Sequence, residues 1–324
     1  MTLPTNSRYA LDLGKKRSAI ESKVKSIRSK VMPLDEAVRK FVLPGSHLAI
    51  GGCLYSRTPT AAIHEIIRQR IGGLTISRSL LGMEADLLIG RSLLKKAVTS
   101  WWSTGYAWGI SRTMREAVEG RSVKFEEWSH LSLGLRYRAA AMGVTFLPTF
   151  SMLGSDLQRV DSVETIDCPY SGEKVLLIPA LYPDVGIIHA DAADRVGNVQ
   201  LSGYEFMDRD IAKSSERVIV TVERIISSDA IRRQPDKTAI PFFCVDAVVK
   251  APYGAYPSEC WNQYEADFEH FAKFAERTNE KGIAGASAYV EEYVLGTKTF
   301  QNFLGKIGKA RLRKLRGNMR NVLN

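Results

Sequence analysis

The chain has 324 residues, of which 45% are hydrophobic and 25% charged, which suits one large or two ordinary globular domains with a sizeable core. No apolar run approaches the roughly 20 residues that a membrane-spanning helix needs, and residues 1–30 lack a signal-peptide core, so a cytoplasmic protein without a membrane partner is expected. The four cysteines are widely spaced and include no C-x-x-C pair, which argues against a zinc site and a disulfide framework.

The net charge of +10 is concentrated at the two ends of the chain. Residues 1–30 carry eight Lys/Arg and two acids, and residues 306–324 carry seven Lys/Arg and no acid, which leaves −3 for the remainder. We therefore expect a basic helical arm over 1–32, a body over 33–304 and a basic tail over 305–324. Such arms can bind RNA, a membrane surface or an acidic partner, or can be solvated helices without a specific role. No aromatic interleaving supports base stacking, so nucleic acid is not expected as a partner.

Predicted helices and short strands alternate along the chain. Residues 18–30 have an apolar stripe at helical spacing, and residues 33–41 predict a second helix with an acidic first turn. A strand at 47–50, a helix at 60–69 and a strand at 74–77 follow. Further strands are expected at 87–90, 97–100, 175–178, 185–188 and 217–221, with covering helices at 208–215 and 267–280. This alternation predicts an α/β fold, an open and mostly parallel sheet covered by helices on both faces.

The most informative segment is 185–200. A short apolar strand, Val185–Ile188, is followed by His189, Asp191 and Asp194, and Gly197–Asn198 then predicts a turn into a second apolar segment. Polar groups just beyond the carboxyl end of a buried strand are where α/β proteins usually build their sites. Each of these residues alone could instead only cap and brace the loop.

This segment has the form His-x-x-x-Ala-Asp-x-x-Gly-Asn, which resembles the signature of family I coenzyme A transferases, in particular α chains of the glutaconate CoA-transferase type. Three further segments match in the same order. They are a Gly-Gly turn with an Arg-x-Pro loop at 49–59, an Ala-Met-Gly loop within 138–156, and Pro252–Pro257, where Tyr256 stands in place of the usual histidine. The resemblance covers residues 33–300.

The resemblance implies the fold, the activity and a partner. The fold would be that of the CoA-transferase or ribose-5-phosphate isomerase-like proteins. The chain would be the α subunit of a two-component transferase, in complex with a β subunit that supplies the nucleophilic glutamate. Coenzyme A would be a substrate, together with an acyl-CoA and a carboxylic acid, and no permanently bound cofactor or metal is implied.

Glycines directly after a strand allow close approach of the backbone, so Gly51, Gly52 and Cys53 are the candidate oxyanion donors of the catalytic site. The Arg57 guanidinium could bind a carboxylate or a phosphate, or could pair with a nearby acid. Tyr106 belongs to an aromatic stretch that could line a pocket or fill the core. The full set of candidate substrate-binding residues is Arg57, Tyr106, Thr149, Ser151, Gly154, His189, Asp191, Asp194 and Asn198.

The chain departs from the family pattern at Ala107, where related α chains often carry a glutamate, and it lacks the Ser-Glu-Asn-Gly motif of β chains. It also has no Gly-x-Ser-x-Gly elbow and no dinucleotide-binding fingerprint. Two alternatives stay open. One is a hydrolase or ring-cleaving enzyme that acts on a CoA thioester. The other is a non-catalytic paralogue that binds an acyl-CoA or a partner protein.

Overall fold

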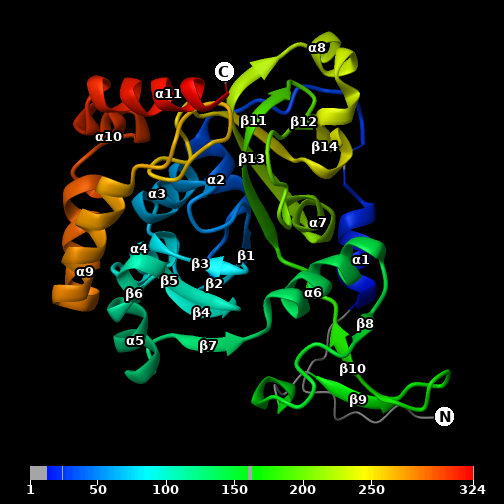
Figure 1. The fold of residues 1–324 in the computed structure, drawn as a ribbon. Helices are drawn as coiled ribbons and strands as arrows, with labels where there is room; N and C mark the ends of the chain where they lie inside the picture. The colour runs from blue at the N-terminus through cyan, green and yellow to red at the C-terminus, as the bar shows by residue number, and fades with distance from the viewer. Residues whose placement is uncertain (1–12, 24, 160–162, 324) are drawn as a thin grey trace.

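The computed structural model describes residues 13–23, 25–159 and 163–323, and within them nine strands form a central sheet (Figure 1). The strand order is β14-β12-β11-β1-β2-β4-β7, and β13 and β15 extend the sheet from β11. The pairs are parallel except where β12 meets β11 and β14, so the predicted mostly parallel sheet is confirmed. The strands are β1 (His47–Ile50), β2 (Leu74–Ser77), β4 (Leu94–Thr99), β7 (Lys124–Glu127), β11 (Val185–Asp194), β12 (Val199–Gln200), β13 (Arg217–Ile226), β14 (Thr238–Ile240) and β15 (Ala247–Lys250).

Side chains of the strands alternate between two cores, one on each face of the sheet. Leu48, Ile50 and Ile187 belong to the core that α2, α3, α4 and α9 cover, whereas Ala49 and Ile188 belong to the core beneath α6 and α7. Consecutive strand residues point to opposite faces, so both faces need a cover, and the predicted two-sided helical layer is confirmed. The helices are α2 (Leu34–Phe41), α3 (Thr60–Arg68), α4 (Met83–Ile89), α5 (Arg112–Glu119), α6 (His130–Met142), α7 (Asp208–Ser214), α8 (Ser228–Arg233) and α9 (Phe268–Tyr289).

Two strand predictions are wrong. Residues 87–90 belong to α4 and the turn after it, and every residue of α4 is buried. Periodicity cannot separate a short, fully buried helix from a buried strand. The second error concerns β11, which continues to Asp194 instead of ending at Ile188. Strand β13 pairs with β11 from Val185 to Asp194, so the backbone groups of β11 find hydrogen-bond partners beyond Ile188 as well. His189 and Asp191 therefore lie within the strand, not beyond it.

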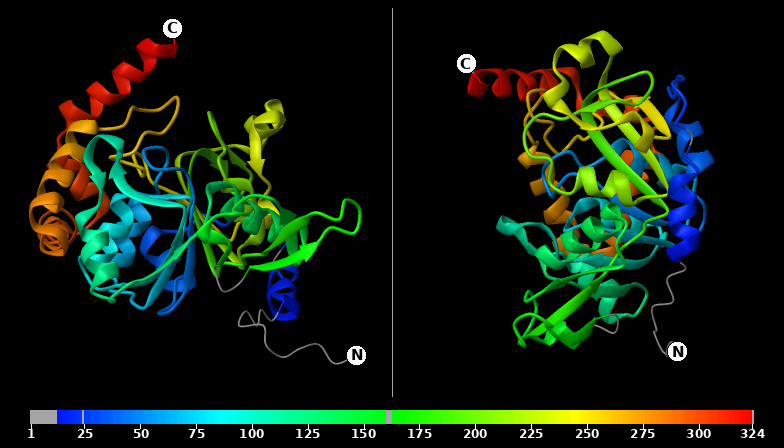
Figure 2. Two further views of the ribbon diagram at one scale, coloured as in Figure 1. Left: turned by 60° about the horizontal axis from the view of Figure 1, so that its bottom comes forward. Right: turned by 90° about the vertical axis from the view of Figure 1, so that its right-hand side faces the viewer.

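Two small sheets lie outside the central one. The predicted strand at 175–178 is β10 (Lys174–Pro179), which pairs antiparallel with β8 (Phe146–Thr149) and β9 (Glu164–Asp167). Figure 2 shows this sheet extending away from the body. The other small sheet joins β3 (Leu80–Leu81), β5 (Trp101–Gly105) and β6 (Gly109–Ile110).

The N-terminal arm is less helical than predicted. Helix α1 spans Leu13–Glu21, whereas residues 25–30 contain no helix. Instead, Lys30 hydrogen-bonds through its backbone to Arg195 and Val248, and the Lys23 Nζ donates to the carbonyl oxygen of Cys244 at 3.0 Å. The predicted helix over 18–30 is confirmed for residues 18–21 and wrong for residues 25–30, where backbone and side-chain bonds to the body replace helical ones.

The C-terminal segment packs on the body. Helix α10 (Phe300–Ile307) contains the boundary predicted at residue 305, and α11 (Lys309–Leu323) follows it (Figure 1). Leu312 and Leu315 are buried in one cluster with Tyr256, and Arg311 binds Asp267. A separate role for either arm stays a prediction. Across the described ranges, no helix is both long and apolar enough to cross a membrane.

Candidate functional site

A cavity of about 130 Å³ lies at the carboxyl edge of the central sheet. The segments that follow β1, β2 and β7 meet there with the residues that precede α7. In parallel α/β sheets this edge is where ligands bind. Of the predicted site residues, Gly52 and Cys53 line this cavity. The full lining is Ile50, Gly52, Cys53, Arg78, Ser79, His130, Phe206, Met207 and Ile211.

The Gly51–Cys53 turn is tightly held from within the chain. Its three N–H groups donate to Ile187 O at 2.8 Å, to Asp208 Oδ1 at 2.6 Å and to Ser56 O at 2.9 Å, in chain order. Gly52 has φ +68°, and a Cβ there would lie 2.2 Å from the carbonyl oxygen of Ser56. Only glycine fits this turn without strain. A substrate oxygen could reach the Gly52 N–H only in place of Asp208, so the oxyanion role stays a prediction.

Arg57 is bound within the chain through both of its terminal nitrogens, while its buried Nε has no partner among the described groups. Its Nη2 lies 2.6 Å from Asp208 Oδ2, and its Nη1 donates to the carbonyl oxygen of Tyr204 at 2.7 Å. The guanidinium also lies over the ring of Phe206, and both members of the ion pair are fully buried. Of the two predicted roles, pairing with a nearby acid is the one these contacts show. A substrate carboxylate would have to displace Asp208, so substrate binding by Arg57 stays a prediction.

Arg78 and His130 were missed from the sequence, although both line the cavity. Arg78 follows β2 directly, and His130 begins α6 three residues after Glu127, where β7 ends. The Arg78 Nη1 donates to Glu84 Oε1 at 2.8 Å, while its Nε has no partner among the described groups. The rule that polar residues after strands form sites would have found Arg78, because it directly follows the predicted strand 74–77.

Cys53 is half-buried in the cavity wall. Burial raises the pKa of its thiol, and the nearby Arg78 guanidinium opposes this rise only in part. The thiol is therefore protonated at neutral pH, which makes it a poor nucleophile. Cys53 is a wall residue of this site and not a reactive thiolate.

His189 belongs to a buried hydrogen-bond network. Its Nδ1 lies 2.9 Å from Thr221 Oγ1 and its Nε2 lies 3.0 Å from Glu223 Oε1, which also accepts from the Tyr264 hydroxyl at 3.0 Å. Cys260 Sγ comes within 4.8 Å of the His189 and Glu223 ligand atoms, a grouping that could hold a metal ion. The hydrogen bonds account for this geometry without one. Both ring nitrogens of His189 are occupied in this arrangement, so a contact with substrate stays a prediction that these bonds do not favour.

Asp194 and Asn198 brace the turn between β11 and β12. Asp194 Oδ1 accepts the N–H groups of Val196, Gly197 and Asn198 at 2.9–3.1 Å. Burial alone would raise the pKa of Asp194, but hydrogen bonds led by those from Asn198 hold it below its usual value. Asn198 in turn accepts from the Phe242 N–H. These contacts show the bracing role that the sequence left open, and substrate binding by either residue stays a prediction that they do not favour.

The Asp191 carboxylate accepts a hydrogen bond from the Ser202 N–H through Oδ2. Its other oxygen, Oδ1, lies 3.9 Å from Cys260 Sγ. Burial raises the pKa of this carboxyl group. Asp191 is 4% exposed and does not line the cavity, so the predicted substrate contact has no support from its position.

The remaining candidates lie outside the cavity lining. Tyr106 is 81% exposed and packs on Trp101 with ring centroids 4.5 Å apart. The Ser151 hydroxyl lies 2.8 Å from the Ser129 hydroxyl. Ser129 is the N-cap of α6 and directly precedes the lining residue His130, so Ser151 lies near the edge of the cavity. Thr149 accepts from the Ser151 N–H, and Gly154 is exposed with open space around its Cα. Substrate contact by these four residues stays a prediction.

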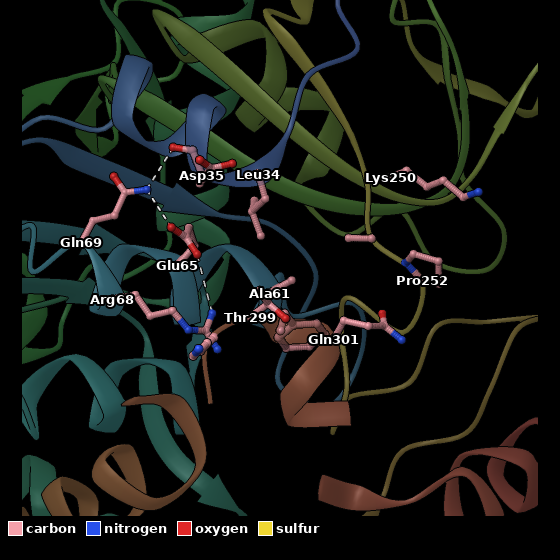
Figure 3. A pocket seen from close by; sticks show the side chains of 13 residues that line it. Leu34, Asp35, Ala61, Glu65, Arg68, Gln69, Lys250, Pro252, Thr299 and Gln301 are labelled. Atoms are coloured by element: carbon pink, nitrogen blue, oxygen red, sulfur yellow. Dashed lines mark hydrogen bonds and ion pairs between the residues drawn. The ribbon is translucent and has the colours of Figure 1, made fainter. Parts of the chain in front are cut away.

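A larger cavity, of about 540 Å³, lies between α2, α3, α10 and residues 250–252 (Figure 3). It contains none of the predicted site residues. Part of its charge is paired within the lining: Glu65 lies 3.6 Å from Arg68, and Gln69 links Glu65 to the Asp35 backbone.

Comparison with known proteins decides the family. A family model described as coenzyme A transferase matches residues 31–251. The chain belongs to the coenzyme A transferase family. It is 38% identical to one of the subunits of glutaconate CoA-transferase from Acidaminococcus fermentans, over 89% of this chain and 95% of that one. The solved structure of that CoA transferase superimposes with a TM-score of 0.85 and 37% identity, over 89% of this chain and 96% of that chain.

Two other relatives of this CoA-transferase chain differ from each other in how much of their own length the chain matches. A single subunit of the 3-oxoadipate CoA-transferase from Pseudomonas knackmussii is 34% identical over 87% of this chain and 100% of its own length. A protein of Archaeoglobus fulgidus is 39% identical over 91% of this chain, which spans only 66% of that longer protein. CoA transferases are enzymes, so the enzymatic class is established with the family.

Proposed function

We propose that this chain is the α subunit of a two-component enzyme that moves CoA between an acyl-CoA and a carboxylic acid. Two observations support the proposal. The chain matches nearly the full length of two proteins that are themselves single subunits of CoA transferases. In addition, none of the nine described residues that line the carboxyl-edge cavity is an aspartate or a glutamate. This composition supports a nucleophilic carboxylate that comes from a partner, namely the active-site glutamate of a β subunit.

The proposed reaction proceeds by two acyl exchanges. The partner's glutamate attacks the thioester carbonyl of the acyl-CoA, forming a mixed anhydride and releasing the CoA thiolate. The thiolate attacks the glutamyl carbonyl of the anhydride, which gives a glutamyl–CoA thioester and the free carboxylate of the first acyl group. A second carboxylate then reverses these steps and leaves as the new acyl-CoA.

In this scheme the α chain shapes the acyl-binding wall. The Gly51–Cys53 turn brings its backbone to the cavity, Phe206 and Met207 provide apolar surface, and His130 begins a helix whose N-terminal dipole favours a developing negative charge. Asp208 would hold the Gly52 N–H in place while the partner carboxylate reacts.

The test is co-expression with a β-type partner, incubation with a panel of acyl-CoAs, borohydride reduction and mass spectrometry. A partner glutamate trapped as its reduced thioester would establish the transferase, and the α chain alone serves as the control that traps nothing. Release of free CoA without a trapped glutamate would instead identify a hydrolase. If an assembled complex gives neither a trapped glutamate nor free CoA, a non-catalytic binding role would be the remaining alternative.

A further inference from the structure

A third cavity, of about 390 Å³, lies at the opposite edge of the sheet, where β13 and β15 begin. The N-terminal arm forms one wall, the end of α2 another, and the segment before β15 the third. The lining residues are Arg28, Ser29, Lys30, Met32, Lys40, Phe41, Arg217, Val245 and Asp246. Residues 28–32, the last part of the arm that the sequence marks as basic, thus complete a pocket on the body.

The positive charge of this cavity exceeds its negative charge. Four of the lining side chains are cationic, and Asp246 is the one acid among them. Its carboxylate is already engaged by Arg217 at 3.3 Å, by the Val218 N–H at 2.9 Å and by Lys23 at 3.7 Å. Arg28 and Lys40 have no ion-pair partner among the described residues. The cavity of Figure 3 is less unbalanced, because two acids, Asp35 and Glu65, stand among its three cationic side chains.

Part of this charge is held out of water. Lys23 and Lys30 are each 6% exposed, and the Lys30 Nζ donates to the carbonyl oxygen of Phe242 at 2.6 Å. Burial lowers the pKa of both ammonium groups. Asp246 opposes this in part, while like-charge repulsion from Arg217 on Lys23 and from Arg28 on Lys30 adds to it. A bound anion would relieve both the repulsion and the lost hydration.

We propose that this cavity binds a small, multiply phosphorylated metabolite that carries an apolar or planar group. Arg28, Lys40 and Arg217 would contact the phosphates, since guanidinium and ammonium groups form charge-assisted hydrogen bonds with phosphate oxygens. Met32, Phe41 and Val245 would contact the organic part. The volume of about 390 Å³ equals roughly a dozen water molecules, which is more than a single phosphate fills.

The experiment uses the full-length chain, alone and assembled with its β partner, and does not depend on turnover. Inorganic pyrophosphate and ADP are the probes, with adenosine as the uncharged counterpart, and binding is measured by titration calorimetry. Tryptic cleavage after Lys25 and Arg28, followed by mass spectrometry, locates the site, because bound probe slows cleavage there. The test variant is Arg28→Gln/Lys40→Gln. Its matched control, Lys95→Gln/Arg121→Gln, removes the same charge from exposed positions elsewhere.

Pyrophosphate and ADP are expected to bind saturably, with affinity reduced by about tenfold or more in the test variant and unchanged in the control. Both probes should protect the Lys25 and Arg28 bonds, and the affinity should fall as salt is raised. Equal loss in variant and control, adenosine binding as tightly as ADP, or no saturation below about 1 mM would each overturn the proposal.

Discussion

The Nη2 of Arg57 lies 2.6 Å from the Oδ2 of Asp208, and neither side chain is exposed to solvent. The same carboxylate accepts the Gly52 N–H at 2.6 Å through its other oxygen. One buried aspartate therefore joins the turn after β1, the loop that leads to α3 and the first residue of α7. The shape of the carboxyl-edge cavity depends on this junction.

Breaking the pair from one side should be costly. Asp208→Asn leaves a buried guanidinium without its counter-charge, so we expect the free energy of unfolding to fall by about 3–5 kcal/mol, measured by urea denaturation. The double variant Arg57→Met/Asp208→Leu removes both charges and should lose less than Asp208→Asn. A single variant that unfolds like the wild type would contradict the buried pair.

Gly52 should tolerate no side chain. Gly52→Ala combines a left-handed backbone with a clash against the Ser56 carbonyl, so we expect loss of CoA transfer and a large loss of stability. Gly172→Ala is the matched control, with φ +74° and open space around it, and should cost only about 1 kcal/mol. Thermal unfolding of the two variants compares them. Equal shifts in Tm would show that the contact with Ser56 is unimportant.

Asp86 should make stability fall as pH rises. Burial raises its pKa to about 7, although Trp102 and Ser111 donate hydrogen bonds to it. The unfolded carboxyl titrates near 3.8, so between about pH 4 and 7 the folded state binds more protons than the unfolded state. The free energy of unfolding therefore falls as the pH rises through this range. Asp86→Asn should flatten this slope and gain relative stability above that range. Parallel pH profiles of unfolding free energy for wild type and variant would refute the assignment.

Asp194 should matter for folding and not for catalysis. Asp194→Ala removes the acceptor of three backbone N–H groups and of the Asn198 and Ser228 side chains, so we expect a loss of about 2–3 kcal/mol in unfolding free energy. In the assembled enzyme below its Tm, kcat and KM should stay near wild type. A selective rise in KM for one substrate would restore Asp194 to the binding site.

The sequence predicts local structure best where apolar periodicity and turn residues agree. The strand 47–50, the Gly-Gly turn and the helix 60–69 are examples, since both signals lie within a few residues of each other. The length of β11 was not predictable in this way, because it depends on pairing with β13. Short apolar runs such as 87–90 fit a buried helix as well as a strand.

The site itself was predicted only in part. The family resemblance identified the turn at Gly52 and Cys53, which does line the cavity. Arg57 and Asp208 are 151 residues apart, and nothing in their local spacing indicates that they meet. The polar residues of 185–200 suggest ligands because buried networks and binding sites use the same side chains. The partners of His189, Thr221 and Glu223, are what distinguish the two, and they lie on another strand.

Asp267 joins three segments through one carboxylate, since it caps α9 at the His270 N–H, accepts the Tyr256 hydroxyl at 2.8 Å and binds Arg311 from the C-terminal helix. Burial acts against its ionisation, yet these donors hold its pKa at about 2. A cut between α10 and α11 would strip Arg311 from this carboxylate and weaken both the start of α9 and the Tyr256 turn. We therefore expect the last helix to unfold together with segments some 50 residues upstream, so that damage at the end of the chain is transmitted to its interior.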